Sequence, residues 1–385
     1  MSLDVIVARD VAELEAHRDA WQELAAAALE SNVFYEPAPL LAGLRHLADS
    51  GAWFAVLVFR NDRLIGFFPL QRRFKPMGAA VLKLLSHPLA FLRTPLVDRD
   101  WGAAAIDAWL AWCRNEIGTA VAVCTGIPSD GAVGCLLRQR LAARGAQVSE
   151  FNLYHRPLLA LTGDGDGYIR AALSGDRRRK LLRQRRQLES GGGLVLRALK
   201  AGDDIEEWVS AFIRLEASGW KGERGSAIGS KPAYREVFCD TIQSLHRLNQ
   251  VHFIGFQRDR QWIAMNCFLR AVHPTLGAFG FKSAYDELFS KLSPSNLLLL
   301  ELVGFLNERA VDIGWLDSCA RSENQFLGAL FRERRAISTL AIGLPGLKGR
   351  VAMGGLRLGL RARDALRPEA AAGRASQSAG LVGGR

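Results

Sequence analysis

The same succession of predicted elements occurs twice along the 385 residues of this chain. In each half, paired helices precede two β-rich runs separated by a short polar turn, and strands and helices then alternate. The turns are Arg60–Asp62 in the first half and 258–261 in the second. A repeated order of this kind indicates a weak internal duplication. We therefore expect an α+β (mixed α/β) fold in which each half is a mostly antiparallel central sheet flanked by helices.

The runs expected to form strands are 53–59, 63–74, 120–127, 155–162, 193–199, 251–257, 262–272, 275–282, 312–318 and 335–342. The stretches expected to form helices are 10–28, 37–51, 101–116, 133–145, 174–190, 203–220, 231–248, 297–309 and 322–334.

Composition is that of ordinary globular domains, because 49% of the residues are hydrophobic and 23% are charged. At about 100–200 residues per domain, this length predicts two domains, which we place at 1–152 and 153–345, followed by a tail at 346–385. The six cysteines stand singly, without a Cys-x-x-Cys pair or a Cys/His cluster, so we expect no metal site.

Nothing in the sequence reads as a targeting or membrane segment. The N-terminus carries acidic residues at once, unlike a secretory signal. The apolar run 297–306 is interrupted by Glu301 and is too short to span a membrane. We therefore expect no transmembrane segment and a cytoplasmic protein whose cysteines are reduced.

The net charge of +11 is concentrated in the tail, which holds eight basic and two acidic residues. This leaves +5 for the body, so charge alone does not require a nucleic-acid partner. Residues 351–366 could form a short basic amphipathic helix, and we expect the last fifteen residues to be disordered. We interpret the tail as a solvated appendage, with contact to a membrane surface or a partner as the alternative.

The predicted helix 174–190 is strongly basic, with seven Lys or Arg residues between 177 and 186. Leu181, Leu182 and Leu188 are left for packing. The helix is either simply solvated or binds an anionic partner: a polyanionic saccharide, a carrier, RNA or a membrane surface. It lacks the interleaved aromatic residues of single-stranded nucleic-acid sites, so we do not expect nucleic acid there.

The segment 275–309 carries the clearest chemical pattern. A strand ends in a polar loop with Ser293, Pro294, Ser295 and Asn296, and a helix follows directly. A helix N-terminus offers unpaired N–H groups and a partial positive charge, which suit phosphate. The alternative is ordinary capping, in which Ser293 or Ser295 caps the helix and Pro294 sets its first turn.

Several pieces of the chain, in order, resemble one known family. They are LSGDRRRKLLRQRRQLESGGGL, EASGWKGERGSAIG, IGFQRDRQWIAMNCFLR, FGFKSAYDELFSKLSPSNLLL and DSCARSENQFLGALFRERR. The stretch 155–340 resembles the acyl-CoA N-acyltransferase (GNAT) superfamily and, more narrowly, the CelD-like acetyltransferases associated with cellulose biosynthesis. That group is related to the Fem-type transferases, which carry two GNAT-like domains in tandem. NVFYEPAPL, LIGFFPLQRR and SHPLAFLRTPLVD resemble its N-terminal region, so the resemblance covers the chain up to residue 345.

The resemblance implies two tandem GNAT-like domains and an acyl-CoA co-substrate, acetyl-CoA or another thioester. Its diphosphate would rest on the N–H groups of Ser295, Asn296 and Leu297, with Ser293 and Phe281 also in the cofactor site. The group usually has Ser-Pro-Gly where this chain has Ser293-Pro294-Ser295. Ser295 would therefore need a negative φ or would carry strain.

The resemblance also suggests catalytic and acceptor residues. Asp317, at the end of the next strand, is our first choice as general base, and Tyr285 is second, as proton donor or substrate contact. Lys282 and Cys319 are further candidates. Trp220, Lys221 and Glu216 would line the acceptor pocket. The alternatives are a cap or turn role for Asp317, loop packing for Tyr285 and core packing for Trp220 and Cys319.

Other chemistries lack their motifs: the sequence has no Gly-x-Ser-x-Gly elbow, no phosphate-binding Gly-Lys-Ser/Thr loop and no His-x-x-x-His pair. We expect an acyl-CoA-dependent acyltransferase that modifies an amine or hydroxyl of a saccharide or cell-envelope precursor. The alternatives are a non-catalytic GNAT-like scaffold of an exopolysaccharide system and a Fem-like transferase that uses aminoacyl-tRNA.

Overall fold

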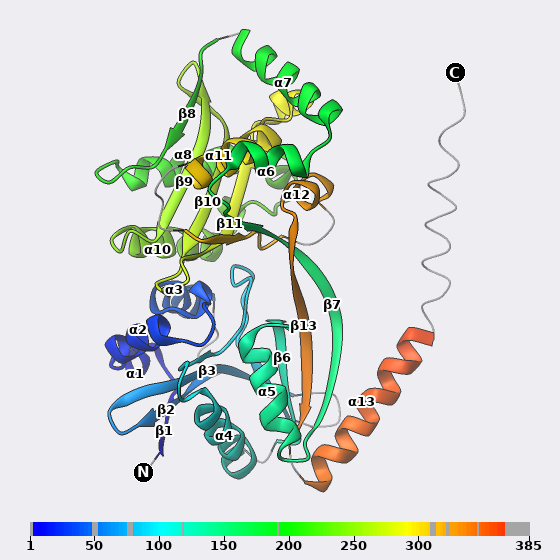
Figure 1. Cartoon of the computed structure of the whole chain (residues 1–385). Helices are drawn as coiled ribbons and strands as arrows, with labels where there is room; N and C mark the ends of the chain where they lie inside the picture. The colour runs from blue at the N-terminus through cyan, green and yellow to red at the C-terminus, as the bar shows by residue number, and fades with distance from the viewer. Residues whose placement is uncertain are drawn as a thin grey trace.

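A computed structural model describes residues 3–47, 53–74, 80–117, 119–190, 192–308, 313–320, 324–344 and 346–365. These residues form one mixed sheet whose strands follow the spatial order β1-β2-β3-β4-β6-β13-β7-β12-β11-β10-β9-β8, with β5 paired to β3 (Figure 1). The strands are β1 (Leu3–Ala8), β2 (Trp53–Arg60), β3 (Arg63–Phe74), β4 (Ala80–Leu84), β5 (Leu96–Val97), β6 (Val121–Pro128), β7 (Gln147–Ala160), β8 (Leu194–Ala198), β9 (Val251–Arg258), β10 (Gln261–Arg270), β11 (Gly277–Tyr285), β12 (Trp315–Asp317) and β13 (Glu333–Gly343).

Helices cover both faces of this sheet. They are α1 (Val11–Glu15), α2 (Arg18–Ala27), α3 (Pro37–Leu47), α4 (Gly102–Trp112), α5 (Ala132–Ala142), α6 (Gly165–Ala172), α7 (Gly175–Ser190), α8 (Ile205–Ala217), α9 (Trp220–Glu223), α10 (Pro232–His246), α11 (Pro294–Glu308), α12 (Gln325–Leu330) and α13 (Leu347–Ala365). Short helical turns are η1 (Val33–Tyr35), η2 (Cys113–Ile117), η3 (Ile228–Ser230) and η4 (Glu287–Leu292).

The two halves of the sheet have the same pairing pattern. In the first half, β1 to β4 are antiparallel neighbours, β4 is parallel to β6, and β6 is antiparallel to β13. In the second half, β8 to β11 are antiparallel neighbours, β11 is parallel to β12, and β12 is antiparallel to β7. The predicted mixed α/β fold with mostly antiparallel pairing in each half is confirmed.

The halves exchange their last strands at the centre of the sheet. β7 directly follows the first-half elements in sequence, yet it pairs with β12 of the second half. β13 follows the second-half elements and pairs with β6 of the first half. The two long strands also pair with each other in antiparallel register, and Figure 1 shows them running side by side. The division into two domains stays a prediction, and its boundary at 152/153 lies inside β7.

The halves also share apolar packing. One cluster of buried side chains combines Phe34 of the first half with Phe238, Phe279 and Phe281 of the second. The Phe34 ring lies edge-on to the ring of Phe279, with centroids 5.8 Å apart, and α3 packs against α10. Removing this apolar surface from water, at about 25 cal/mol per Å², holds the first half against the face of the second.

Most predicted elements form within a few residues of their expected ends. The turn between β2 and β3 contains Asn61 with a φ of 53°, and the turn between β9 and β10 contains Asp259 and Arg260 with φ of 50° and 65°. Helix α11 begins at Pro294, three residues before the predicted start at Leu297, because proline's fixed φ suits the first helical position.

The basic helix α7 corrects one packing prediction. Leu182, expected to pack, is 55% exposed, whereas Leu181 and Leu188 are buried as expected. The third buried position is Gln184, which lies one turn after Leu181 on the same helical face.

Helix α13 contains most of the helix predicted at 351–366. Its Arg357 donates to the hydroxyl of Ser149 and to the carbonyl of Val148 in β7. The last fifteen residues, for which disorder was predicted, lie outside the described residues. Within the described chain, no helix combines the length and apolar character needed to cross a membrane.

Candidate functional site

The sheet of the second half splits between β11 and β12. These parallel strands pair only from Gly277 to Phe279, opposite Trp315 to Asp317. Beyond this point β11 continues to Tyr285, whereas the residues that follow β12 leave the sheet. Gly280 stands where the split opens, and a Cβ on it would lie 2.7 Å from the carbonyl oxygen of Ser318. Only glycine permits so close a backbone approach.

A β-bulge lies at the same level. Cys267 of β10 is opposite Lys282, and the next residue, Phe268, is opposite Gly280. Phe281 is therefore the extra residue on β11, and the strand bends where the split begins.

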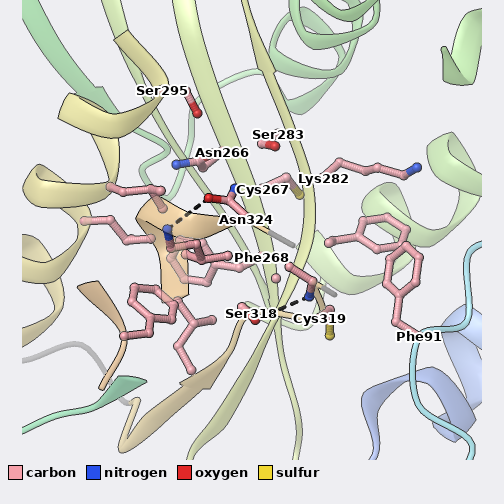
Figure 2. A pocket seen from close by; sticks show the side chains of 18 residues that line it. Phe91, Asn266, Cys267, Phe268, Lys282, Ser283, Ser295, Ser318, Cys319 and Asn324 are labelled. Carbon is pink, nitrogen blue, oxygen red and sulfur yellow. Dashed lines mark hydrogen bonds between the residues drawn. The ribbon is translucent and has the colours of Figure 1, made fainter. Parts of the chain in front are cut away.

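A cavity of about 260 Å³ occupies the split. Polar side chains of Asn266, Ser283, Ser295 and Asn324 line it together with apolar residues of α11 and α12 (Figure 2). Phe91, from the loop between β4 and β5, reaches it from the first half. Ligand pockets commonly measure about 300–1,000 Å³, so this cavity suits a narrow, chain-like part of a ligand.

The N-terminus of α11 lies at the rim of this cavity but offers fewer free amides than predicted. The N–H groups of Asn296 and Leu297 donate to the carbonyl of Ser293, at 3.0 and 3.1 Å. Within the described chain, the N–H of Ser295 has no acceptor. Two of the three predicted amides are therefore occupied, because Ser293 precedes the helix and its carbonyl accepts the first helical bonds. That this helix end holds a diphosphate stays a prediction.

The strained backbone position is Ser293. It has φ 52° and ψ 51°, in the left-handed region, whereas Ser295 is not among the described residues with positive φ. Ser295 therefore has no conformational strain, although the related group has glycine at this position. The residue with a left-handed, strained backbone is Ser293, two positions earlier.

A side chain of helix α7 forms hydrogen bonds with the loop that precedes α11. The buried Gln184 donates its Nε2 to the carbonyl of Lys291 at 2.9 Å and to the hydroxyl of Ser293 at 3.2 Å. Arg185 also forms an ion pair with Glu301 of α11. The basic helix is thus joined by side-chain contacts to the turn that begins α11.

Asp317 lies outside the cavity lining and is fully buried. Its Oδ2 is 3.4 Å from Nη1 of Arg156 and 3.3 Å from Nη1 of Arg335, and its Oδ1 accepts the N–H of Cys319 at 2.8 Å. A carboxylate held between two arginines and removed from the cavity is poorly placed to take a proton from an acceptor. The general-base role predicted for Asp317 is not supported by this position.

The other predicted catalytic residues fall into two groups. Lys282 lines the cavity, and its ammonium lies 5.8 Å from the ring centroid of Phe91. Cys319 also lines it, but burial raises the pKa of its thiol well above the ordinary value, so the thiol is neutral. Tyr285 does not line the cavity. The pKa of its hydroxyl is raised, mainly by burial and secondly by a hydrogen bond with Glu287.

Of the predicted acceptor residues, Glu216 lies outside the described cavity lining. Glu216 is buried and accepts the N–H of Ile228 at 2.7 Å, so it ties α8 to η3. Trp220 and Lys221 begin α9, and their side chains lie outside the described part of the chain. Phe281 lines the cavity, yet its ring stacks on Phe238 in the shared core, with centroids 5.6 Å apart.

Sequence reasoning did not single out Asn266, Ser283, Asn324 or Phe91. Asn266 had a readable signal, since it is the one strongly polar residue in the apolar run from Trp262 to Leu269. Asn324 caps α12 by accepting the N–H of Leu327 at 3.0 Å. A titratable carboxylate or imidazole is absent from the described cavity lining.

Residues 175–323 match the family model of the acetyltransferase (GNAT) domain. The matched stretch runs from the start of α7 past β12, so it includes the split strands and most of the cavity lining. This part of the chain is therefore GNAT-like by sequence. No curated protein matches the chain.

Solved structures extend the likeness of fold over both halves. The crystal structure of FemX has a TM-score of 0.56 at 10% identity, covering 87% of this chain and 97% of that one. L-PGS from Bacillus licheniformis has a TM-score of 0.52 at 10% identity, with 88% and 94% covered. A conserved protein of unknown function from Bacteroides thetaiotaomicron VPI-5482 has a TM-score of 0.55 at 9% identity, with 86% and 97% covered. At these identities the likeness shows the fold alone.

The described residues contain no group of three or more His, Cys, Asp or Glu side chains that could hold a metal ion.

Proposed function

We propose that this protein transfers an acyl group from acyl-CoA, with acetyl-CoA as the expected donor, to an amine or hydroxyl of a saccharide or cell-envelope precursor. The observation that carries this proposal is the cavity in the split between β11 and β12, next to the free N–H of Ser295. We also propose that the protein is a member of the CelD-like group and that it is cytoplasmic, because acyl-CoA is made in the cytoplasm.

The donor would enter along the N-terminus of α11. The helix has 15 residues, and its N-terminal end carries a partial positive charge that attracts the diphosphate. The Ser295 N–H supplies one direct hydrogen bond there. The slender pantetheine arm fits the cavity, whose apolar wall includes Leu299 and Leu302.

The acceptor would approach from the side of the first half, where Phe91 and Lys282 line the cavity. The acceptor nitrogen or oxygen attacks the thioester carbon, the carbon–sulfur bond breaks, and the sulfur leaves as a thiolate that takes up the proton lost by the acceptor. Since a carboxylate or imidazole is absent from the described lining, positioning of the two substrates supplies most of the rate enhancement. Lys282 is the cationic residue of the described lining, and we assign to it the stabilisation of the departing sulfur.

Calorimetric titration with acetyl-CoA tests this proposal, with two tryptophan variants on adjacent positions of α11. Leu299 lines the split cavity, whereas Leu300 lines a different groove on the same helix. Leu299→Trp should fill the cavity and weaken acetyl-CoA binding by at least about tenfold, while Leu300→Trp should leave it close to wild type. Absence of binding by the wild type at millimolar acetyl-CoA would overturn the proposal in favour of a non-catalytic GNAT-like scaffold.

One observation favours a second candidate, the Fem-like transferase that uses aminoacyl-tRNA. Exposed Arg179, Arg183 and Arg186 project from α7, the helix that contacts the loop before α11 through Gln184. An anionic partner on this helix would therefore lie beside the donor site. Retention of charged tRNA that weakens steeply with salt would support this candidate, and binding that is indifferent to salt would exclude it.

A further inference from the structure

One polar side chain in the split cavity has an unsatisfied hydrogen-bond donor. Asn266 is 7% exposed and lines the cavity. Its Nδ2 is fully buried and has no acceptor within the described chain. Asn266 shares the cavity lining with Ser295 and with Ser283, its partner across β10 and β11 (Figure 2).

This donor is costly to the folded protein. Leaving a buried polar group without its hydrogen bond costs about 1–3 kcal/mol. Asn266 stands on β10 between Met265 and Cys267, which are buried in the apolar core, and its neighbours on the cavity face are Ala264 and Phe268. Packing alone would favour an apolar residue at this position. An unsatisfied buried amide in a native structure requires an explanation, and a ligand acceptor is the one its location offers.

The surroundings restrict what that acceptor can be. Asn266 pairs with Ser283 across β10 and β11, and the lining also contains the neutral side chains of Ser295 and Asn324 and the cationic Lys282. Since the diphosphate is assigned to the N-terminus of α11 at the rim, the acceptor for Asn266 inside the cavity is a neutral oxygen on the slender chain that follows the diphosphate. Acyl-pantetheine carries such oxygens in its thioester and in its amide carbonyls.

We propose that Asn266 donates a hydrogen bond from Nδ2 to a carbonyl oxygen on the acyl-pantetheine arm of the donor. This inference rests on the proposed function, since it assigns the contact by which the same cavity recognises its donor. The residue is a ligand contact that fixes the depth of the arm in the split.

Three ligands distinguish the possible oxygens: acetyl-CoA, CoA without the acyl carbonyl, and adenosine 3′,5′-diphosphate without the pantetheine arm. Each is titrated calorimetrically into the wild type and into Asn266→Ala. We expect Asn266→Ala to lose about tenfold in affinity for acetyl-CoA and to keep wild-type affinity for adenosine 3′,5′-diphosphate. A loss confined to acetyl-CoA assigns the thioester carbonyl, and an equal loss for CoA assigns a pantetheine amide.

Two results would overturn the inference while leaving the proposed function intact. One is wild-type affinity of Asn266→Ala for acetyl-CoA, and the other is an equal loss for all three ligands. If the wild type binds none of the three, the proposed function itself fails, which is a separate outcome.

Thermal unfolding without ligand gives an independent reading. Asn266→Leu replaces the unpaired amide with an apolar side chain of similar size, so its Tm should rise by about 2 °C. A fall in Tm would mean that the amide supports the fold and does not await a ligand, and the inference would then be wrong.

Discussion

Oδ2 of Asp317 lies 3.3 Å from Nη1 of Arg335, and this contact joins β12 to β13. Arg335 also binds Glu30 at 2.7 Å, and Glu30 belongs to the first half. On the other side, Arg156 of β7 lies 3.4 Å from the same carboxylate oxygen. Asp317 therefore stands in a buried ion network that connects the exchanged strands.

Asp317→Asn should destabilise the fold and leave chemistry largely intact. Removing one partner from a buried ion pair costs about 3–5 kcal/mol, and here two arginines lose their shared carboxylate. Urea denaturation should show this loss, while turnover per folded molecule stays near wild type. Asp259→Asn, at an exposed position, is the control and should shift stability by less than about 0.5 kcal/mol. Wild-type stability with abolished turnover would restore Asp317 as the base.

Ser295→Asp should affect binding and stability in opposite directions. A carboxylate in the first turn of α11 is favourable to the helix by about 0.3–1 kcal/mol, so thermal stability should hold or rise. The same charge would repel the diphosphate, and acetyl-CoA affinity should fall by at least about tenfold. Asn296→Asp adds the same charge one residue away, outside the described cavity lining, and should weaken binding less. Equal affinity of the wild type and Ser295→Asp for acetyl-CoA would show that the diphosphate does not bind at this helix end.

Gln184→Leu should loosen the turn before α11. The substitution removes the hydrogen bonds to the Lys291 carbonyl and the Ser293 hydroxyl. At about 0.5–1.5 kcal/mol for each bond, stability should fall by about 1–3 kcal/mol, and acetyl-CoA affinity should fall several-fold. Gln187→Leu, on an exposed position of the same helix, is the matched control. If both variants bind acetyl-CoA alike, α7 does not position the loop.

Glu36→Gln should change how stability depends on pH. Glu36 is buried and accepts Nε2 of Gln250 and the N–H of Val272, each at 2.9 Å, so it joins the two halves. Burial raises its pKa from 4.5 to about 7, against the opposing effect of these hydrogen bonds. A raised pKa means that the stabilisation is complete below pH 4.5 and is lost as pH rises to about 7. At about 1.4 kcal/mol for each pH unit, roughly 3 kcal/mol is involved.

The stability of the wild type relative to Glu36→Gln should therefore decline between pH 4.5 and 7 and then level off. Chemical denaturation of both proteins across this range measures the difference. The comparison is needed because burial lowers the pKa of His87 and of His252 to about 4, which destabilises both proteins as pH falls below 6.5. A difference that does not vary with pH would mean that Glu36 is ionised throughout.

Local structure was largely predictable from the sequence because its causes are local. Asn61 and Asp259 supply left-handed turn residues between alternating strands, and Asp204 caps α8 by accepting the N–H of Glu206. Each of these signals lies within a few residues of its effect. The split beside β11 has no such local signal, because Gly280 explains it only once the nearby Ser318 carbonyl is seen.

The candidate site was harder to predict because its decisive contacts join distant residues. Asp317 ends a strand, as a general base would, but its partner Arg156 is 161 residues away in sequence. The amides of Asn296 and Leu297 appeared free at a helix start, yet the left-handed conformation of Ser293 places an acceptor beneath them. Asn266 has no protein partner, and that can be recognised only when its neighbours are known.

The exchange of β7 and β13 has a consequence for synthesis on the ribosome. When the first half has emerged, the open side of β6 lacks its neighbour, since β13 is translated after all the other described strands. An unpaired strand edge invites association with other chains. Neither half can complete its sheet by itself, so nascent chains should remain vulnerable to aggregation until β13 has left the exit tunnel.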